Sequence, residues 1–594
     1  MKARLQRVLA TIERLGSGPA GLRRLAVLVV VLLGSVVFQG LQVDDLWHRA
    51  FFLHDTTWAH GKRPFWAIFT FFDGDPAVMA RFRDLGMVPW WVDDHVRIAF
   101  MRPLSSFTHL VDYTLWPSLP GAMHLHSLAW YVALVVVAAL LFRRILPPSV
   151  SALAGLLYAV DHTHGGVVGW VANRNAIISA TFGFAALLFH DRASRGEARA
   201  RWMAAGCLAL ALLGGESGLG AAAYLTAHAL TLDRRAWRDR ARDLVPHAAV
   251  LAAWMAAYRV GGYGAVGSGL YLDPGRSPLR VLAKVPEFGT LLLASEWGSI
   301  GAETELVLPP AGRTALLVVA AIIVVTSFVA LARRLRDRPS TRFFLLGSLL
   351  AILPCCATMP ATRLLLIPGF GLLGVVAEAL ADFAAHGTQA RGVERVARGF
   401  FAGWVGGGHL VLSTLLLGPL AWQVVLLQET LARFSRSFPP DDAVLPSQRL
   451  VAVGVPDPTF AGYIPLLRYT YGWTVPRNAL GLTNGTRPSE IRRIDASAVE
   501  VTAPGGFYQW ATDLLERDPE VPVPVGTRIR LSDVTIDVVH TTSKGVPDVA
   551  RFTFDAPADD ARYRWVTWAD GKYVPFQLPP VGAIVSVAPR TPGT

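Results

Sequence analysis

Long runs of apolar residues, separated by short polar segments, dominate roughly the first 430 positions. A membrane-spanning helix needs about 20 mostly apolar residues, and the first such run extends from Leu25 to Val43. Further runs lie near 126–142, 149–163, 175–190, 202–215, 217–232, 244–261, 313–332, 343–359, 361–384 and 399–424. The pattern predicts an α-helical polytopic membrane protein with about 11 transmembrane helices.

The basic residues indicate how these helices are oriented. In residues 1–24 apolar positions recur at helical spacing among arginines, which predicts an amphipathic helix on the cytoplasmic membrane surface. No A-x-A-like cleavage site follows the first run, so we expect an uncleaved anchor. Arginines then recur in every second short loop, the positive-inside pattern; they are Arg143, Arg144, Arg192, Arg195, Arg199, Arg201, Arg234, Arg235, Arg238, Arg240, Arg242, Arg333, Arg334, Arg336, Arg338, Arg391, Arg395 and Arg398.

Two segments on the opposite side of the membrane are too long to be simple connectors. The first long loop, 44–124, is rich in Trp, Phe, His and Asp, and its stretch from Trp58 to Phe72 predicts a helix lying in the membrane interface. The second long loop is 262–312, within which the apolar part of 282–295 is either another interfacial helix or a re-entrant piece.

After about residue 430 the hydrophobic pattern becomes that of short strands. Candidate strands are 449–454, 498–503, 527–531, 534–540, 562–568 and 583–588, separated by Pro- and Gly-containing turns. Residues Phe507 to Leu515 predict one short helix. We therefore expect a transmembrane domain at 25–429 and a soluble, β-rich (α+β) domain at 430–594, which an odd number of spans places outside the cytoplasm.

Composition narrows the class of protein further. Of 594 residues 52% are hydrophobic and only 17% charged, and the mean hydropathy is +0.39, which excludes an ordinary soluble protein and a disordered chain. The net charge of +12 is explained by the loop arginines facing anionic lipid, so no nucleic-acid partner is expected. The three cysteines lie within apolar runs and cannot build a disulfide framework.

An acidic pair, Asp44 and Asp45, directly follows the first predicted span. At the C-terminal end of a helix an acid is opposed by the helix dipole, so the pair gains nothing from local stability. Two interpretations stay open with about even weight: a solvated loop start, or a carboxylate held at the outer membrane surface as a base or metal ligand.

A second polar cluster separates the third and fourth predicted spans. Arg174 leads directly into an apolar run, and because a central arginine costs about 2.5–3.5 kcal/mol on insertion scales, it usually has a partner. Its neighbours Asn173 and Asn175 make a snorkelling arginine a weaker explanation. His162 and His164 resemble a metal pair, but without a third ligand a hydrogen-bonded loop is the favoured interpretation.

Two more charged residues complete a candidate site on one membrane face. Glu216 interrupts an apolar stretch at the outer turn of a helical hairpin, and Arg363 stands at the outer start of a late span. Arginines beside carboxylates at the lipid boundary suit a substrate with a phosphate headgroup and a hydrocarbon tail. A guanidinium would bind the phosphate while a carboxylate removes a proton from an attacking hydroxyl, giving an inverting displacement.

These residues resemble the GT-C membrane glycosyltransferases, in particular the branch of protein O-mannosyltransferases and related TPR-bearing transmembrane proteins. The matching segments are Asp44-Asp45; Arg102-Pro103-Leu104, Leu115-Trp116 and His124-Leu125; His164, Trp170 and Arg174; Glu216; and Arg363. The chain is also similar to bacterial polytopic membrane proteins that carry Trp90-Trp91, Arg102-Pro103-Leu104-Ser105-Ser106 and Asn173-Arg174-Asn175, a likeness that implies no substrate. The resemblance covers roughly 25–384.

The resemblance implies a glycosyltransferase of the bacterial cytoplasmic membrane that uses a polyprenyl-phosphate sugar and a glycan or protein acceptor. Asp44 or Asp45 would be the base and Arg174 with Arg363 the phosphate clamp, while Glu216 and His164 orient the acceptor or a cation. His162, Asn173, Asn175 and Arg102 complete the expected substrate-binding set. No resident cofactor is identified, and a divalent cation is left open.

Departures from the family pattern favour an alternative. Gly215 stands where the family has a lysine, Gly166 stands where it often has a glutamate, and no TPR repeats follow. The alternative is a non-catalytic protein of the same fold that binds or moves a lipid-linked glycan. A small-molecule transporter ranks last, because the sequence shows no duplicated pair of interrupted spans.

Overall fold

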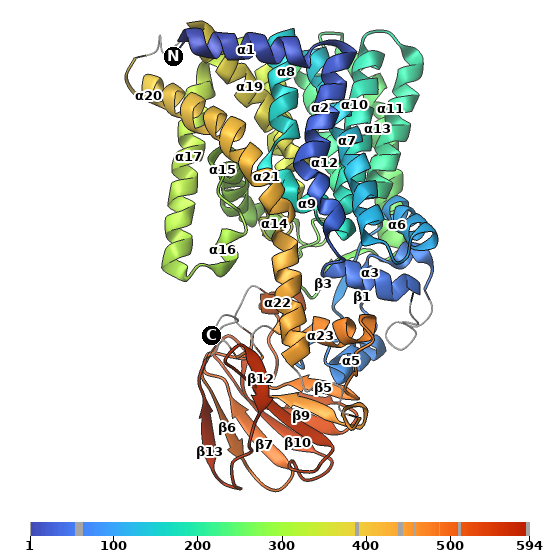
Figure 1. Cartoon of the computed structure of the whole chain (residues 1–594), viewed down its shortest axis with the longest axis vertical. Helices are drawn as coiled ribbons and strands as arrows, with labels where there is room; N and C mark the ends of the chain where they lie inside the picture. Colours follow the sequence, from blue (N-terminus) through green and yellow to red (C-terminus); the bar gives the residue numbers. More distant parts are fainter. Residues whose placement is uncertain are drawn as a thin grey trace.

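The computed structural model describes residues 2–53, 63–386, 391–437, 443–455, 458–485, 487–508 and 512–589. A bundle of helices forms one end of the molecule and a β-rich domain the other, with the long loops as a layer between them (Figure 1). The bundle contains α2 (Gly18–Leu33), α7 (Pro120–Ile145), α8 (Pro148–Ala159), α9 (Gly165–Val168), α10 (Arg174–Ser194), α11 (Ala198–Gly214), α12 (Leu219–Thr231), α13 (Trp237–Val260), α17 (Pro310–Asp337), α18 (Pro339–Cys355), α19 (Pro368–His386), α20 (Gly392–Phe400) and α21 (Thr414–Ala421).

Six helical segments of the described chain are long and apolar enough to cross a membrane, which supports the prediction of a membrane protein. They are Gly18–Phe38, Pro120–Ile145, Val171–Ser194, Pro310–Asp337, Pro368–Ala385 and Gly392–Ser437. The prediction of about eleven spans is not confirmed. Several of the other bundle helices are short: α8 has 12 residues and α12 has 13, about 20 Å of helix at 1.5 Å per residue.

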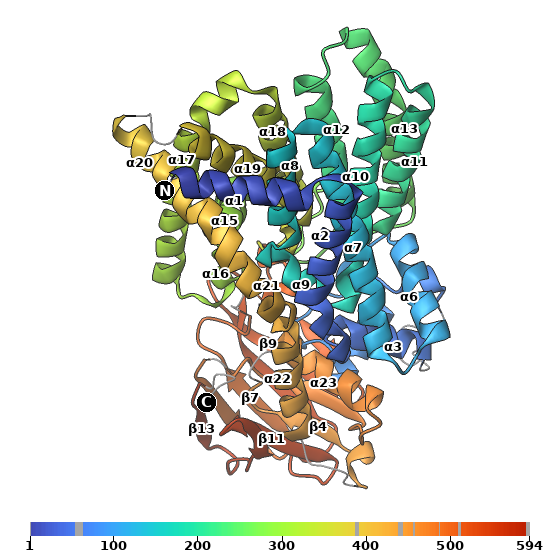
Figure 2. The same ribbon diagram turned by 45° about the horizontal axis from the view of Figure 1, so that its top comes forward.

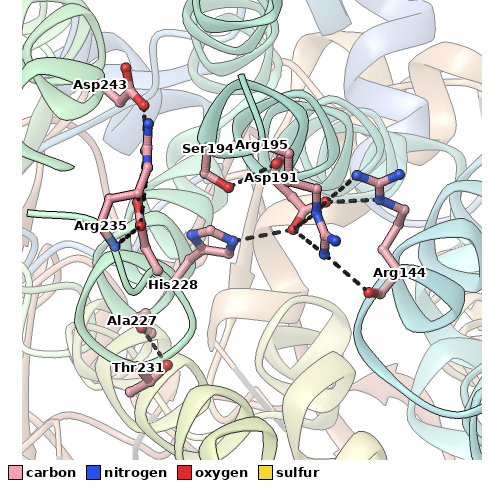
Figure 3. A network of polar contacts seen from close by, with 10 residues as sticks. Arg144, Asp191, Ser194, Arg195, Ala227, His228, Thr231, Arg235 and Asp243 are labelled. Atoms are coloured by element: carbon pink, nitrogen blue, oxygen red, sulfur yellow. Dashed lines mark hydrogen bonds and ion pairs between the residues drawn. The ribbon is translucent and has the colours of Figure 1, made fainter. Parts of the chain in front are cut away.

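The N-terminal helix α1 (Lys2–Gly16) lies across the end of the bundle instead of along it (Figure 2). Its far end is held by Arg143, whose Nη2 donates to the carbonyl of Gly16 at 2.7 Å. Figure 3 shows part of the arginine-rich loops at this same end, joining α7, α10, α12 and α13 through ion pairs. The amphipathic helix and the basic loops therefore share the end of the bundle away from the β-rich domain (Figure 1).

The first long loop forms α3 (Asp44–Leu53), β1 (Thr70–Asp73), α5 (Pro76–Leu85), β2 (Arg97–Ala99) and α6 (Pro103–Leu115). The interfacial helix predicted for Trp58–Phe72 is wrong for the described part of that stretch: residues 63–72 hold a 3-10 turn, Phe65–Ala67, and the start of β1. The remainder of the stretch lies outside the described residues. Strand β2 pairs with β1 and with β3 (Gly264–Val266), so a small sheet ties the two long loops together.

The second long loop contains a helix where one was expected. Helices α14 (Pro278–Lys284) and α15 (Thr290–Gly298) are joined by a π-helical turn, and a short α16 (Thr304–Val307) follows. Every residue of α15 from Leu291 onward is buried, and Trp297 packs edge-on against Phe328 of α17 and Phe401. Of the two predicted alternatives, this burial favours the re-entrant piece over an interfacial helix.

The C-terminal part is β-rich, as predicted. Its sheets run β13-β6-β7-β10-β9-β8 and β12-β11-β4-β5. All six predicted strands are present, as β4 (Arg449–Ala452), β7 (Ala498–Thr502), β8 (Arg528–Arg530), β9 (Val534–Thr541), β11 (Tyr563–Ala569) and β13 (Ile584–Val587). Four strands were not predicted: β5 (Asn478–Gly481), β6 (Ser489–Arg493), β10 (Pro547–Phe554) and β12 (Lys572–Pro575). Within the predicted helix Phe507–Leu515, the described residues form only a 3-10 turn, Thr512–Leu515.

One long helical segment, Gly392–Ser437, runs from the bundle into the β-rich domain. It comprises α20, two π-helical turns, α21 and α22 (Gln423–Ser437), and it passes the predicted domain boundary at residue 430 without a break in the helix. At its end Phe434 packs edge-on against Trp568 of β11, with ring centroids 4.6 Å apart. The link between the two domains is therefore a helix and not a flexible linker.

The first long loop shares a hydrophobic core with the C-terminal domain. Trp90 and Trp91 are buried among strands of the large sheet, and Trp90 Nε1 donates to the carbonyl of Leu482 at 3.1 Å. Nearby, the buried guanidinium of Arg449 bridges Asp84 of α5 and Asp533. This shared core fixes the β-rich domain against the loop that carries Asp44.

Candidate active site

A cavity of about 350 Å³ lies where the bundle meets the long loops. Its polar residues come from six separate parts of the chain and include Asp44, Arg102, Asn173, Asn175, Glu216, Tyr258, Arg259, Tyr271, Asp273 and Arg363. Its remaining wall is apolar, built by α12, α13 and α18 with residues such as Leu219, Met255 and Ala351. The cavity thus combines charged side chains with a hydrocarbon-like wall.

A strained turn aims Asp44 into this cavity. Val43, just before it, has a φ of 46°, a conformation that costs a β-branched residue energy and that persists only where the surroundings impose it. The Val43 amide donates to Oε1 of Gln428, on α22, at 2.9 Å. The interdomain helix therefore helps to set the position of the acidic pair.

The prediction from the helix dipole was wrong in sign. The first span ends at the 3-10 turn Gly34–Phe38, and Asp44 and Asp45 instead form the first turn of α3. A carboxylate in the first turn of a helix is stabilised by the dipole. The sequence did not reveal this, because the apolar run continues to Val43, past the end of the span, and so leads directly into the acidic pair.

Asp44 is held by a residue from the C-terminal domain. The hydroxyl of Tyr463, on α23 (Pro458–Thr470), donates to Asp44 Oδ1 at 2.6 Å. Burial raises the pKa of the Asp44 carboxyl above its usual value, although the Tyr463 hydrogen bond and the charges of Arg363 and Arg102 act in the opposite direction. A raised pKa suits a carboxylate that takes a proton near neutral pH.

Asp45 has a different environment. Its side chain is 1% exposed, and its two oxygens accept hydrogen bonds from the backbone amides of Gln42 and Ala172 at 3.0 and 2.6 Å. Burial raises the pKa of this carboxyl to about 8. Asp45 thus ties the turn before α3 to the turn before α10, while Asp44 reaches the cavity.

Arg102, Glu216 and Arg363 line the cavity together with Asp44. Arg102 Nε donates to Glu216 Oε2 at 2.8 Å, and its guanidinium stacks on Phe100, 4.3 Å from the ring centroid. Arg363 lies 5.7 Å from the ring centroid of Trp170. In the described parts of the chain no carboxylate forms an ion pair with Arg363, so its charge remains available to an anion in the cavity.

The other candidate residues fall into two groups. Asn173 and Asn175 line the cavity. Arg174 does not: it is fully buried, its Nη1 pairs with Asp112 at 2.6 Å, and its Nη2 donates to the carbonyl of Met123. The partner that the sequence required for Arg174 is therefore an acid of α6, and the guanidinium is satisfied before any substrate binds.

His162 and His164 also lie away from the cavity. Both are buried in the turn between α8 and α9, next to Asp161. His164 Nδ1 is 2.9 Å from the hydroxyl of Tyr131, and His162 Nδ1 is 2.8 Å from Oγ of Ser413. Neither ring reaches Asp44 or Glu216, so the structure does not bring the histidines and the acids to one surface.

The two departures from the family pattern have different surroundings. A side chain at Gly166 would meet the Gln423 amide at 2.4 Å, so glycine allows α9 to pack closely against the α21–α22 junction. At Gly215 a Cβ would lie 3.3 Å from Asn175 Oδ1, beside the cavity. Glycine at 166 thus has a packing reason, and at 215 too a side chain would press against Asn175.

A second, smaller cavity of about 150 Å³ meets the first at Asp44. It lies between the long loops and the C-terminal domain and is lined in part by Phe72, Tyr463 and Glu516. Asp44, Phe71, Phe100 and Tyr271 line both cavities. Asp44 is therefore reached from two sides, one facing the bundle and one facing the β-rich domain.

Sequence reasoning missed Tyr463 and the pair formed by Arg259 and Asp273, whose two hydrogen bonds measure 2.9 and 3.0 Å. Arg259 ends α13 and Asp273 follows in the second long loop, so their pairing closes one side of the first cavity. Arg259 at the end of a predicted span was a usable signal. No feature of the sequence pointed to Tyr463.

No family model matches the chain, and no curated protein matches its sequence. The chain is similar to the solved oligosaccharyltransferase of Archaeoglobus fulgidus tethered with an acceptor peptide (13% identity, 78% of this chain, 64% of that chain, TM-score 0.38). A structure of the AglB oligosaccharyltransferase from the same organism, with an inhibitory peptide and dolichol-phosphate, has equal identity and coverage and a TM-score of 0.36.

The chain is also similar to ArnT from Cupriavidus metallidurans bound to undecaprenyl phosphate (14% identity, 78% of this chain, 91% of that chain, TM-score 0.34). The chain spans 64% of the length of the two archaeal structures. At these scores the likeness carries no conclusion about activity, and the resemblance to the protein O-mannosyltransferase branch stays a prediction.

Proposed function

We propose that the chain is a GT-C-type inverting glycosyltransferase that transfers a sugar from a polyprenyl-phosphate donor to an acceptor at the outer face of a bacterial cytoplasmic membrane. The observation that supports the proposal is the first cavity, which is lined by Asp44 and Arg363 together with apolar residues. A phosphate on a long hydrocarbon chain has the same two-part chemistry.

In this proposal Arg363 binds the donor phosphate. Its guanidinium is braced on Trp170 and has no carboxylate partner among the described residues. Charge-assisted hydrogen bonds from arginine to phosphate are about twice as strong as neutral ones. Arg102 lines the same cavity, and its ion pair with Glu216 fixes the orientation of its guanidinium. Arg102 is therefore a positioning residue in this proposal.

Asp44 acts as the general base. It accepts the proton of an acceptor hydroxyl as that oxygen attacks the anomeric carbon, and the bond from that carbon to the phosphate oxygen breaks. The electron pair leaves with polyprenyl phosphate, which remains on Arg363. Phosphate is a weak base, so the leaving group needs no proton, and attack opposite to it inverts the anomeric centre.

The second cavity provides a route for the acceptor. It reaches Asp44 from the side of the C-terminal domain, whereas the apolar wall of the first cavity lies on the side of the bundle. An acceptor hydroxyl arriving there would meet the face of Asp44 that Tyr463 contacts. The β-rich domain thereby contributes to the site in this proposal, with the domain outside and α1 inside the cell.

The test uses the full-length protein in lipid nanodiscs with a panel of polyprenyl-phosphate hexoses. Release of polyprenyl phosphate, with sugar passing to an added acceptor or slowly to water, supports the proposal. Mass spectrometry of co-purified lipid selects the members of the panel. Binding of the lipid-linked sugars without any release would reject catalysis and favour the non-catalytic glycan-binding alternative.

A further inference from the structure

A second buried polar cluster lies outside both cavities. Its members come from three distant segments: Asp161 and His162 from the turn after α8, Glu296 from α15, and His409 from the π-helical turn His409–Ser413. All four side chains are at most 4% exposed. None of the four lines either cavity, and the proposed reaction does not use them.

Three of these side chains converge, and the fourth, Glu296, contacts one of them. One ligand atom each of Asp161, His162 and His409 lies within 4.8 Å of the others. The Glu296 carboxyl is in hydrogen-bonding contact with that of Asp161. Ser413 Oγ lies between the two imidazoles, 2.8 Å from His162 Nδ1 and 3.1 Å from His409 Nδ1.

The polar groups of this cluster are not balanced by the protein. Two carboxyl groups meet in a buried space, and like charges in contact cannot both ionise without a counter-charge. His409 Nε2 donates to the backbone carbonyl of Glu296 at 2.5 Å, but no donor from the described residues reaches either carboxyl oxygen of Glu296 or Asp161 Oδ2, and His162 Nε2 has no partner among them. Each unpaired buried atom has lost its hydrogen bonds to water without gaining a replacement. A proton shared by the carboxyls would relieve their repulsion but would leave the imidazole nitrogen unpaired.

We propose that Asp161, His162, Glu296 and His409 bind one divalent transition-metal ion of the zinc class. Two imidazoles with two carboxylates are a donor set that Zn²⁺ accepts at about 2.0–2.2 Å, with ligand atoms about 3.3 Å apart in a tetrahedron. The observed spacing is wider, so the side chains must draw together by rotamer adjustment. Four protein ligands and full burial make this a structural site, without an open coordination position for substrate.

The ion would join segments of the fold that lie far apart in the sequence. It pins α15 and the His409 turn of the interdomain helix to the segment that continues into Trp170 and Asn173 of the cavity wall. The first turn of α19 closes the other side, where a Cβ at Gly369 would lie 3.1 Å from Glu296 Oε1. The metal therefore affects the cavity indirectly, by fixing the position of the segment that forms part of its wall.

The test is elemental analysis of tag-free, full-length protein purified in detergent, dialysed with Zn²⁺ and then freed of excess metal. We expect about one ion per chain, as for a closed structural site, and a loss of about tenfold or more in affinity for His409→Ala and Asp161→Asn. The matched control is His247→Ala, which removes an equally buried histidine on α13 and should leave the metal in place.

X-ray absorption of the zinc-loaded protein keeps the proposal falsifiable if a variant fails to fold. The spectrum should show two imidazole ligands together with oxygen ligands, and no sulfur. An absence of bound metal in the wild-type protein overturns the proposal. So does full retention of metal by a folded His409→Ala protein, or a zinc environment without imidazole.

Discussion

Two charged clusters at opposite ends of the same bundle have opposite electrostatic characters. In the cluster around Asp191, that carboxylate meets Arg144 at 2.7 Å and Arg195 at 3.0 Å, and Arg235 bridges two further acids (Figure 3). In the cluster around Asp44, the carboxylate is held by a tyrosine hydroxyl, and Arg363 faces a cavity. We call the first cluster closed, because its charges pair with one another, and the second open, because Arg363 has no carboxylate partner among the described residues.

The charges of the closed cluster hold helices together, whereas in the proposed function the charges of the open cluster bind a ligand. A guanidinium placed between carboxylates stabilises the packing of the helices that carry them, whereas breaking such a buried pair is costly. An unpaired guanidinium at an apolar cavity contributes little to stability, and under the proposed function its position is explained by an anionic ligand. The open cluster is therefore the candidate active site, and the closed one is its structural counterpart.

The largest expected effect is that of Asp44→Asn on sugar transfer. Removing a general base should lower the turnover rate by about 10²–10⁴-fold, because the amide cannot take the proton of the acceptor hydroxyl. Rates are measured as polyprenyl phosphate released per folded molecule. The control Asp191→Asn should keep its rate per folded molecule, and a normal rate in Asp44→Asn would remove the distinction between the clusters.

Arg363→Ala should weaken binding of polyprenyl phosphate. Hydrogen bonds to a charged group contribute about 1.5–3 kcal/mol, so the dissociation constant should rise by about one to two orders of magnitude. Calorimetric titration of nanodisc-embedded protein with the short-chain lipid phosphate measures it. Arg144→Ala, from the closed cluster, provides the comparison and should leave the dissociation constant unchanged; equal losses in both variants would contradict the assignment.

The melting temperature should respond in the opposite way to sugar transfer, with the larger loss in the variant of the closed cluster. Asp191→Asn removes the negative charge shared by Arg144, Arg195 and His228 and turns one of its acceptor oxygens into a donor. We expect a loss of about 1–3 kcal/mol, seen as a lower melting temperature in detergent. Asp44→Asn should melt at or above the wild-type temperature, since it removes a buried charge. A larger drop for Asp44→Asn than for Asp191→Asn would mean that Asp44 is structural.

The smallest effect concerns the pH profile of Tyr463→Phe. Asp44 must be ionised to act as a base, so kcat/KM should rise with pH through the pKa of its carboxyl, which burial raises. The Tyr463 hydrogen bond lowers that pKa, and its removal should shift the acidic limb to higher pH by about one unit. A shift to lower pH, or none, would show that Tyr463 does not act on Asp44.

The bundle was predictable because its apolar runs are long, and the missed strands show where the pattern weakens. Strand β10 is central in its sheet, yet it begins with a proline and carries Asp548 and Arg551. Arg551 faces outward and pairs with Glu500 on β7 at 2.9 Å. A strand with one polar, ion-paired face has too few apolar residues to stand out before its partners are known.

For the site, position along the chain identified Asp44, Glu216 and Arg363, because they stand at ends or turns of apolar runs on the same predicted side, whereas Arg102 came from the family resemblance. Arg174 illustrates the limit of that reasoning. Its burial demanded a partner, but Asp112 supplies it from an unremarkable stretch of α6. Tyr463 is 419 positions from Asp44 and lies in an ordinary apolar helix, so only the folded chain brings the two together.

One helical segment runs through α21 and α22, so its length sets the rotation of the C-terminal domain about the helix axis. One residue inserted between Trp422 and Gln428 would turn the C-terminal domain by about 100° and push it outward by about 1.5 Å. Tyr463 would move away from Asp44, and Trp90 and Trp91 would lose their buried position in the C-terminal domain. Natural length variation is therefore expected in the sheet's hairpins and not in this stretch.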